Sequence, residues 1–218
     1  MAADDLPVLI VGDVHGDLEW LFKALKPYPA GLWHTIFLGD LVDYGMFGVG
    51  ALRYARDRPN SEALLGNHEV AMLWALRDPT RVGWWIAVGG QLHDLEELRQ
   101  DEPLQRWMRE RPALMKLPDG TLVQHCGNDS YLGLRDEPDD VNRVVAEQLK
   151  SGSERRLWDF LSSPNVFETQ STRLVRYLDR MGARRVAFGH KPHRGKKPLA
   201  FDGGKALNFE GAVAPLPD

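Results

Sequence analysis

Short apolar runs that end in a glycine or a polar residue recur along this chain and constrain its fold more than any other feature. The first three are Val8–Val11 before Gly12-Asp13, Thr35–Leu38 before Gly39-Asp40, and Ala63–Leu65 before Gly66-Asn67-His68. Two later runs, over 121–124 and 185–188, end at His125 and at Gly189-His190. Such runs are typical of buried strands. The sequence therefore predicts five buried strands, each followed by a polar side chain.

Helix-like patterns lie between these runs. Apolar residues over 18–25 and over 70–74 repeat at the three- and four-residue spacing of an amphipathic helix. Alternation of strands and helices favours an α/β fold. Because open α/β sheets bind ligands at the carboxyl ends of their strands, we expect the polar residues to meet at one edge.

The domain organisation follows from length and from the absence of linkers. No internal repeat, low-complexity tract or linker rich in serine and glycine divides the 218 residues. We therefore expect a single domain over 1–218. The stretches 81–112 and 136–163, which are helix-like and rich in tryptophan or charge, are expected to form a helical cap or insertions of this domain.

Composition excludes several classes of protein. The best apolar runs, 31–39 and 83–93, are shorter than the roughly 18 residues of a membrane helix, so we expect no membrane association. The acidic start of the chain, with no apolar signal segment after it, predicts a cytoplasmic protein. A net charge of −4 argues against general nucleic-acid binding. A single cysteine, Cys126, excludes an internal disulfide and a thiolate zinc site.

The polar residues after the strands have the chemistry of metal ligands. Asp13 and His15 are two residues apart, so in an extended chain their side chains share one side. Asp40 follows Asp13 by 27 residues, and Asn67 follows Asp40 by 27. In chain order the candidates are Asp13, His15, Asp40, Asn67, His125 and His190. This set without thiolate suits Mn, Fe, Co or Zn, and it is large enough for two ions that share a carboxylate.

Three long motifs in this set resemble those of a known family. They are Gly12-Asp13-Val14-His15-Gly16, Gly39-Asp40-Leu41-Val42-Asp43 and Gly66-Asn67-His68-Glu69, followed by His125 and Gly189-His190. Together they resemble the five ordered motifs of the calcineurin-like metallophosphoesterases, in the phosphoprotein phosphatase branch that includes small bacterial and phage Ser/Thr phosphatases. Symmetrical dinucleoside tetraphosphatases share the motifs. The resemblance implies a central β-sandwich of two mixed sheets flanked by helices, with a dinuclear metal site at the carboxyl ends of the strands.

The resemblance also implies a division of the ligands between two divalent ions. It assigns Asp13, His15 and Asp40 to one metal, and Asp40, Asn67, His125 and His190 to the other, with Asp40 bridging. Manganese is expected foremost, with iron, zinc, cobalt or nickel as alternatives. The implied nucleophile is a hydroxide held between the metals, which attacks the phosphorus in line without a covalent enzyme intermediate.

His68 and Asp43 are expected to be catalytic rather than ligating. By the resemblance, His68 protonates the leaving oxygen as a general acid, and Asp43 orients it and favours its protonated form. An alternative for Asp43 is that it caps a helix starting near Phe47.

Substrate binding is where the chain departs from the family. Phosphoprotein phosphatases have a phosphate-gripping arginine at the position of Tyr44, and a second expected arginine aligns with Phe160. Tyr44 could donate one hydrogen bond to phosphate instead, and cations or imidazole from the loop after His190 could replace the arginines. The loop candidates are Lys191, His193 and Arg194. Cys126, next to His125, is interpreted as a small buried residue, with a redox-sensitive thiol as the alternative.

Three functions follow from this sequence. The first is a metal-dependent phosphomonoesterase related to Ser/Thr protein phosphatases, acting on a phosphoprotein or a small phosphoester. The second is a nucleotide or dinucleoside polyphosphate hydrolase, which the missing arginines favour slightly. The third is a non-catalytic metal-binding scaffold, against which the retention of Asp43 and His68 argues.

Overall fold

The strands form two sheets, one of four strands and one of five, within the residues that this computed structural model describes, 6–193 and 197–217. The first sheet has the order β3-β2-β1-β9, in which β1, β2 and β3 run parallel and β9 is antiparallel to β1. Its strands are β1 (Val8–Val11), β2 (His34–Phe37), β3 (Ser61–Ala63) and β9 (Val213–Pro215).

The second sheet has the order β4-β5-β6-β8-β7. Its central strands β5, β6 and β8 are parallel, and the edge strands β4 and β7 are antiparallel to their neighbours. The strands are β4 (Leu114–Lys116), β5 (Thr121–Cys126), β6 (Arg185–Gly189), β7 (Leu199–Phe201) and β8 (Ala206–Asn208). Both sheets are therefore mixed, as the motifs implied.

A small apolar core joins the two sheets. Ile10 and Ile36 of the first sheet belong to the same buried cluster as Val123, Ala187 and Leu207 of the second. Burying each of these side chains contributes about 1 to 3 kcal/mol to folding. The inward side chains of the two sheets thus fix the strand ends of one sheet relative to those of the other.

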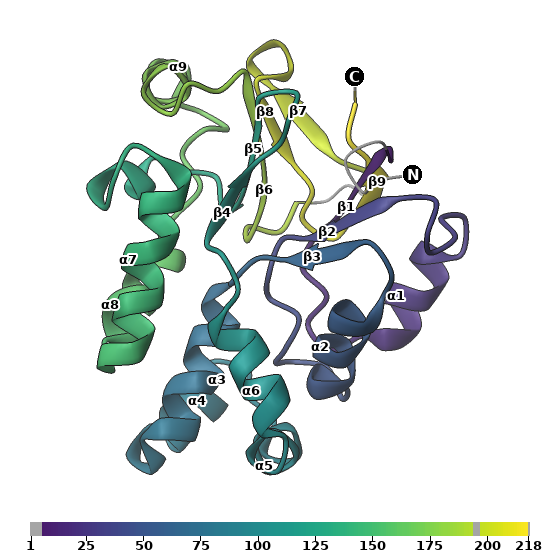
Figure 1. The fold of residues 1–218 in the computed structure, drawn as a ribbon, viewed down its shortest axis with the longest axis vertical. Helices are drawn as coiled ribbons and strands as arrows, with labels where there is room; N and C mark the ends of the chain where they lie inside the picture. The colour runs from purple at the N-terminus through teal and green to yellow at the C-terminus, as the bar shows by residue number, and fades with distance from the viewer. Residues whose placement is uncertain (1–5, 194–196, 218) are drawn as a thin grey trace.

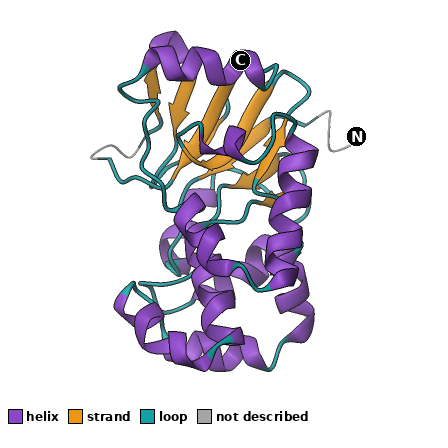
Figure 2. Ribbon diagram, turned by 90° about the vertical axis from the view of Figure 1, so that its left-hand side faces the viewer, coloured by secondary structure: helices purple, strands orange, loops and turns teal. Residues whose placement is uncertain are grey.

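Helices flank the sandwich (Figures 1 and 2). α1 and α2 lie beside the first sheet, α9 lies beside the second, and α3 to α8 gather below both in the view of Figure 1. The helices are α1 (Leu18–Leu25), α2 (Gly48–Asp57), α3 (Asn67–Arg77), α4 (Val82–Ala87), α5 (Leu92–Arg99), α6 (Glu102–Arg109), α7 (Pro138–Ser151), α8 (Glu154–Leu161) and α9 (Ser171–Arg180). Among the described residues, no helix has both the length and the apolar character needed to cross a bilayer.

The predicted elements are present, with additions. All five predicted strands occur, although the third, expected over 63–65, lies two residues earlier as β3, and α1 and α3 occupy the two predicted helical segments. The stretches 81–112 and 136–163 contain α4 to α6 and α7 to α8. The four strands that were not predicted, β4, β7, β8 and β9, have three residues each. Strands this short carry too little periodicity to be identified from sequence.

Candidate metal centre

The loops that follow β1, β2 and β3 are joined by backbone hydrogen bonds. The backbone amides of Val14 and His15 both donate to the Asp40 carbonyl, at 3.0 and 2.9 Å. A Cβ on Gly66 would lie 2.2 Å from Oδ1 of Asp40, so the third loop can approach the second only because it begins with glycine. This interlocking brings the polar residues of three strand ends to one place.

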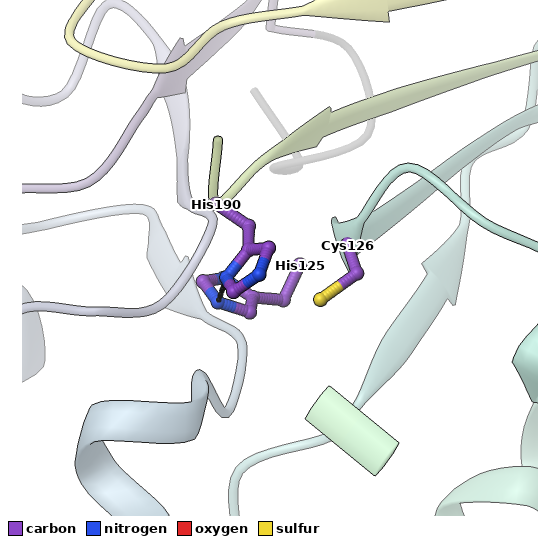
Figure 3. Close-up of side chains that lie close together, drawn as sticks. All are labelled: His125, Cys126 and His190. Carbon is purple, nitrogen blue, oxygen red and sulfur yellow. Dashed lines mark hydrogen bonds between the residues drawn. The ribbon is translucent and has the colours of Figure 1, made fainter. Parts of the chain in front are cut away.

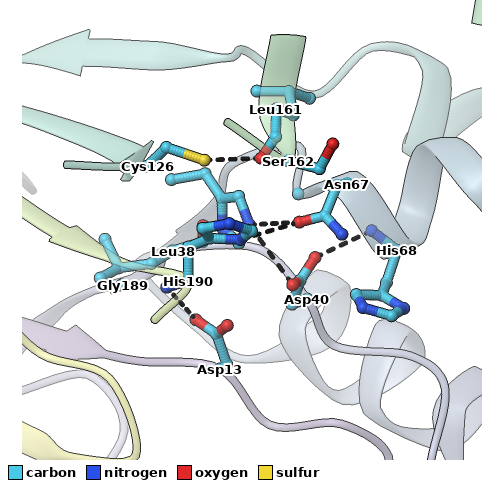
Figure 4. A network of polar contacts seen from close by, with 12 residues as sticks. Asp13, Leu38, Asp40, Asn67, His68, Cys126, Leu161, Ser162, Gly189 and His190 are labelled. Carbon is cyan, nitrogen blue, oxygen red and sulfur yellow. Dashed lines mark hydrogen bonds and ion pairs between the residues drawn. The ribbon is translucent and has the colours of Figure 1, made fainter. Parts of the chain in front are cut away.

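The six candidate ligands lie together, and Figure 4 labels four of them, Asp13, Asp40, Asn67 and His190. Asp13 and His15 follow β1, Asp40 follows β2, Asn67 begins α3, His125 is in β5 and His190 follows β6. Ligand atoms of Asp13, Asp40 and His125 lie within 4.8 Å of one another, and so do ligand atoms of His15, Asp40 and His68. Asp40 therefore lies between the residues of β1 and those of the second sheet.

Three atoms that can accept a hydrogen bond or bind a cation converge around Nε2 of His125. Its Nε2 lies 2.8 Å from Oδ1 of Asn67, 3.2 Å from Nδ1 of His190 and 3.3 Å from a carboxylate oxygen of Asp40. Figure 3 shows the imidazole rings of His125 and His190 beside Cys126; they pack edge to face, with centroids 5.0 Å apart. Nδ1 of His125 lies 2.9 Å from the Leu38 carbonyl and donates to it, which leaves Nε2 facing the cluster.

The Asp13 half of the site is built in the same way. Nδ1 of His15 donates to the Val42 carbonyl at 3.0 Å, so its Nε2 faces Oδ2 of Asp13 at 3.9 Å. A backbone carbonyl thus fixes the tautomer of both His15 and His125, as is usual for histidines that bind metals. The carboxylate, amide and imidazole donors of this set have the chemistry that divalent cations such as Mn²⁺ or Zn²⁺ bind.

The buried carboxylate of Asp40 and the neighbouring histidines shift one another's pKa values. Burial alone would lower the pKa of His125, but the carboxylate of Asp40 raises it. Burial alone would raise the pKa of Asp40, but the charges of His125 and His68 hold it well below its usual value. Burial and the neighbouring His125 lower the pKa of His190 to about 4, so its imidazole is neutral and able to ligate.

Several side chains at this edge are held by strained backbone. His15, Asp40, Asp43, Tyr44 and His190 all have positive φ, between 49° and 73°. Each such residue costs on the order of 1 to 3 kcal/mol, and such strain concentrates at functional sites. The sharp turns allow the side chains to leave the strand ends toward a common centre.

The imidazole of His68 lies beside this cluster and is paired with a buried carboxylate. Its Nδ1 lies 2.7 Å from Oδ2 of Asp43, and its backbone amide donates to Oδ1 of Asp40 at 2.9 Å. Burial alone would lower the pKa of His68, but the Asp40 charge and the hydrogen bond to Asp43 raise it to about 9. The imidazole is therefore protonated at neutral pH.

Trp85 completes this arrangement and was given no role by the sequence analysis. Its indole Nε1 donates to both oxygens of Asp43, at 3.0 and 3.2 Å, and the ring is fully buried. The alternative that Asp43 caps the helix starting near Phe47 is wrong. Asp94 does this instead, accepting from the Gly48 and Val49 amides at 3.0 Å. Tryptophans at helical spacing give no sign of which indole reaches a carboxylate.

The side chain of Glu69 joins the loops that carry the ligands through hydrogen bonds. Its buried carboxylate accepts from the backbone amides of Leu41, Asp40 and Gly66 at 2.7, 2.8 and 2.9 Å. The bond to Gly66 also fixes the start of α3, because Glu69 is the third residue of that helix. The motif of Gly66 to Glu69 could have revealed this role, since a glutamate at that position is a known helix-start signal.

Replacing Glu69 with glutamine is expected to destabilise the fold by about 2 to 3 kcal/mol, because the amide can no longer accept all of these bonds and buried donors lose their partners. Chemical denaturation monitored by circular dichroism measures the change. Glu96→Gln, on an exposed position of α5, is the matched control and should change stability by less than about 0.5 kcal/mol. Equal stability of the two variants would contradict the supporting role of Glu69.

The candidate substrate-binding residues differ in their exposure and in their contacts. The ring of Tyr44 is 61% exposed and lies 4.9 Å from the ring of His15 and 5.2 Å from that of His68. Lys191 is exposed, with Nζ 4.0 Å from Glu168, and His193 is half-buried in the loop after β6. Arg194 lies outside the described residues. The ring of Tyr44 thus contacts two residues of this cluster, His15 and His68.

Cys126 and Phe160 both pack against other parts of the protein. Cys126 is buried, its thiol donates to the Leu161 carbonyl, and burial raises its pKa well above the usual value. A thiol protonated in this way is unreactive, which favours the structural interpretation over the redox one. Phe160, aligned with the second expected arginine, packs edge-on against Tyr131.

The fold and these motifs define a phosphoesterase family. A family model described as calcineurin-like phosphoesterase matches residues 6–194, and the chain belongs to that family. A curated relative, the symmetrical bis(5'-nucleosyl)-tetraphosphatase of Aeromonas hydrophila subsp. hydrophila, is 32% identical over 124 residues. The match covers 54% of this chain and 43% of the relative, so the chain matches less than half of that protein's length.

Solved structures share the fold at low identity. A cold-active protein-tyrosine phosphatase of a psychrophilic Shewanella species has a TM-score of 0.71 and 19% identity, covering 94% of this chain and 71% of that one. A protein serine/threonine phosphatase from Saccharomyces cerevisiae has a TM-score of 0.65 and 15% identity, with 96% and 68% covered. A putative diadenosine tetraphosphatase has a TM-score of 0.55 and 19% identity, covering 94% of this chain and 83% of that one.

Proposed function

We propose that the protein is a metal-dependent phosphoric ester hydrolase that cleaves phosphate monoesters. The observation that carries this proposal is His68, held protonated by Asp43 next to the cluster of ligand atoms. A protonated imidazole in this position can give its proton to a leaving oxygen. A scaffold that only binds metal has no need of this pair.

The metal centre is part of the proposal. We assign Asp13, His15 and Asp40 to one divalent cation and Asp40, Asn67, His125 and His190 to the other, with manganese foremost. When bound, the two cations would neutralise charge on the phosphoryl group and lower the pKa of water between them. The chain itself contributes three things: ligand orientation through backbone carbonyls, a bridging carboxylate at Asp40, and the proton of His68.

A second candidate is hydrolysis of a dinucleoside polyphosphate. The name of the curated relative and the presence of Tyr44, where an arginine was expected, favour it. A tyrosine hydroxyl makes one hydrogen bond, whereas an arginine grips a dianionic phosphate with two. The substrate of this candidate carries less charge on each internal phosphate and has less need of such a grip.

A substrate panel separates the two candidates. The purified protein with Mn²⁺ would be given p-nitrophenyl phosphate, its bis ester, phosphoserine and phosphotyrosine peptides, and diadenosine tetraphosphate. We expect the highest kcat/KM for monoesters. Turnover of only the bis ester or the dinucleotide would contradict the leading proposal and support the second, while bound metal with no hydrolysis would support the scaffold.

Replacing Tyr44 with arginine is expected to raise kcat/KM for monoesters about tenfold, because one charge-assisted bond to phosphate contributes about 1.5 kcal/mol or more. Steady-state kinetics on p-nitrophenyl phosphate and diadenosine tetraphosphate measures the change. The dinucleotide should gain less. Tyr44→Phe, which removes only the hydroxyl, is the matched control. A loss of monoesterase activity in Tyr44→Arg would contradict this prediction. It would show that the tyrosine ring itself contacts the substrate and that a positive charge at this position cannot replace it.

A further inference from the structure

Glu210 lies beside the metal centre although none of the motifs contains it. It is in the turn between β8 and β9, which carries the chain from the second sheet to the first. The Gly12 amide donates to the Ala212 carbonyl at 2.9 Å, and a Cβ on Gly12 would lie only 2.1 Å from the Phe209 carbonyl oxygen. The turn therefore lies directly against the end of β1, next to Asp13.

The carboxylates of Asp13 and Glu210 meet at the end of β6. A Cβ on Gly189 would lie 2.5 Å from Oδ1 of Asp13 and 3.6 Å from Oε2 of Glu210. The absence of a side chain at Gly189 thus makes room for Asp13, and Glu210 lies within contact distance of the same point. Asp13 is 6% exposed and Glu210 is 8% exposed, so solvent screens neither charge well.

Each of these carboxylates has an oxygen without a hydrogen-bond partner. Among the described residues, Oδ2 of Asp13 and Oε2 of Glu210 are buried and accept no hydrogen bond. Two buried carboxylates with free oxygens are costly unless a cation compensates them.

We propose that Glu210 is a further carboxylate of the metal centre and acts on the cation held by Asp13 and His15. This inference rests on the proposed dinuclear centre. The unpartnered oxygens of Asp13 and Glu210 supply the charge and the coordinating capacity that a hard divalent cation prefers. Oε2 of Glu210 binds that cation directly, in addition to Asp13, His15 and Asp40.

The test measures metal binding rather than turnover. Protein stripped with a chelator would be titrated with Mn²⁺ by isothermal calorimetry, and bound metal counted by mass spectrometry. For Glu210→Gln, which keeps the size and removes the charge, we expect the affinity of one of the two sites to fall about tenfold or more. The melting temperature of the metal-free variant should be equal to or higher than that of the wild type, because a repulsive contact is removed.

Glu168→Gln is the matched control. Glu168 lies in the same region and accepts from Asn208, whose own side chain accepts from the Glu210 amide, so both variants lose one charge near this turn. Only Glu210→Gln should weaken binding. The loss should disappear when His15→Ala has already removed the first site.

Three results would overturn the inference. Unchanged or tighter Mn²⁺ binding by Glu210→Gln would show that Glu210 does not ligate. An equal loss in Glu168→Gln would show a general effect of charge. Wild-type protein that binds no metal would overturn the dinuclear centre itself, and this inference with it. Failure of the proposed centre is thus distinguished from failure of the role of Glu210 alone.

Discussion

Replacing His68 with asparagine is expected to lower kcat by about 10² to 10⁴ for phosphate esters with a poor leaving group, which is the usual contribution of a general acid. The amide of asparagine can still donate to Asp43 from near the position of Nδ1, so the contact at 2.7 Å has a replacement. What is lost is the proton on the opposite nitrogen. Steady-state kinetics with phenyl phosphate measures the effect.

The leaving group supplies the internal control. p-Nitrophenolate departs without needing a proton, so the same variant should lose much less activity on p-nitrophenyl phosphate. Metal content should equal that of the wild type, because His68 is not among the proposed ligands. An equal loss on both esters would contradict the role as an acid and would indicate that His68 positions the substrate or the metals.

Asp43 and Trp85 hold His68 in the orientation that the proposed role as a proton donor requires. The indole of Trp85 donates to Asp43, which keeps the carboxylate oriented toward His68 in a buried setting. Burial raises the pKa of Asp43, while its bonds to His68 and Trp85 lower it. The histidine thus gains a charged partner that solvent does not screen, a contact that contributes more inside a protein than at its surface.

The sequence predicted the donor atoms because each motif is local. Asp13 and His15 lie in one strand-end loop, and the motif from Gly66 to Glu69 combines a ligand, the proton donor and the helix start within four residues. Runs of apolar residues before each motif identified the parallel strands whose ends meet. The mixed sandwich followed from the family resemblance and not from periodicity.

Other contributors could not be predicted, because their positions depend on packing between distant segments. Trp85 reaches Asp43 from α4, and Glu210 reaches Asp13 through the turn that links the two sheets. The strands on both sides of that turn, β8 and β9, have three residues each and give little signal. Only the order of strands in the two sheets places residue 210 beside residue 13.

The site is maintained at a cost in stability. Asp13, Asp40, Glu69 and Glu210 are all buried within one small region, and several neighbouring residues have strained backbone. Burying charges of the same sign is unfavourable unless cations or hydrogen bonds compensate. The metal-free protein should therefore be less stable than the metal-bound one, with the difference set by metal concentration through binding to the folded state.

Replacing Asp40 with asparagine is expected to lower activity strongly on every phosphate ester, whatever its leaving group. Asp40 is the one carboxylate shared by both halves of the donor set, with one oxygen 3.3 Å from His125 and the other bonded to the His68 amide. An amide offers one neutral oxygen and cannot bridge two cations. If this removes about 4 kcal/mol of transition-state stabilisation, kcat/KM falls about 10³-fold.

Metal analysis separates this cause from misfolding. After dialysis against Mn²⁺ and desalting, the wild type should retain two ions per chain and Asp40→Asn fewer than one, while the circular dichroism spectra stay the same. Asp57→Asn removes an exposed carboxylate at the end of α2 and should change neither quantity. Two retained ions in Asp40→Asn would show that the remaining ligands suffice without a bridge, and the shared role of Asp40 would then be wrong.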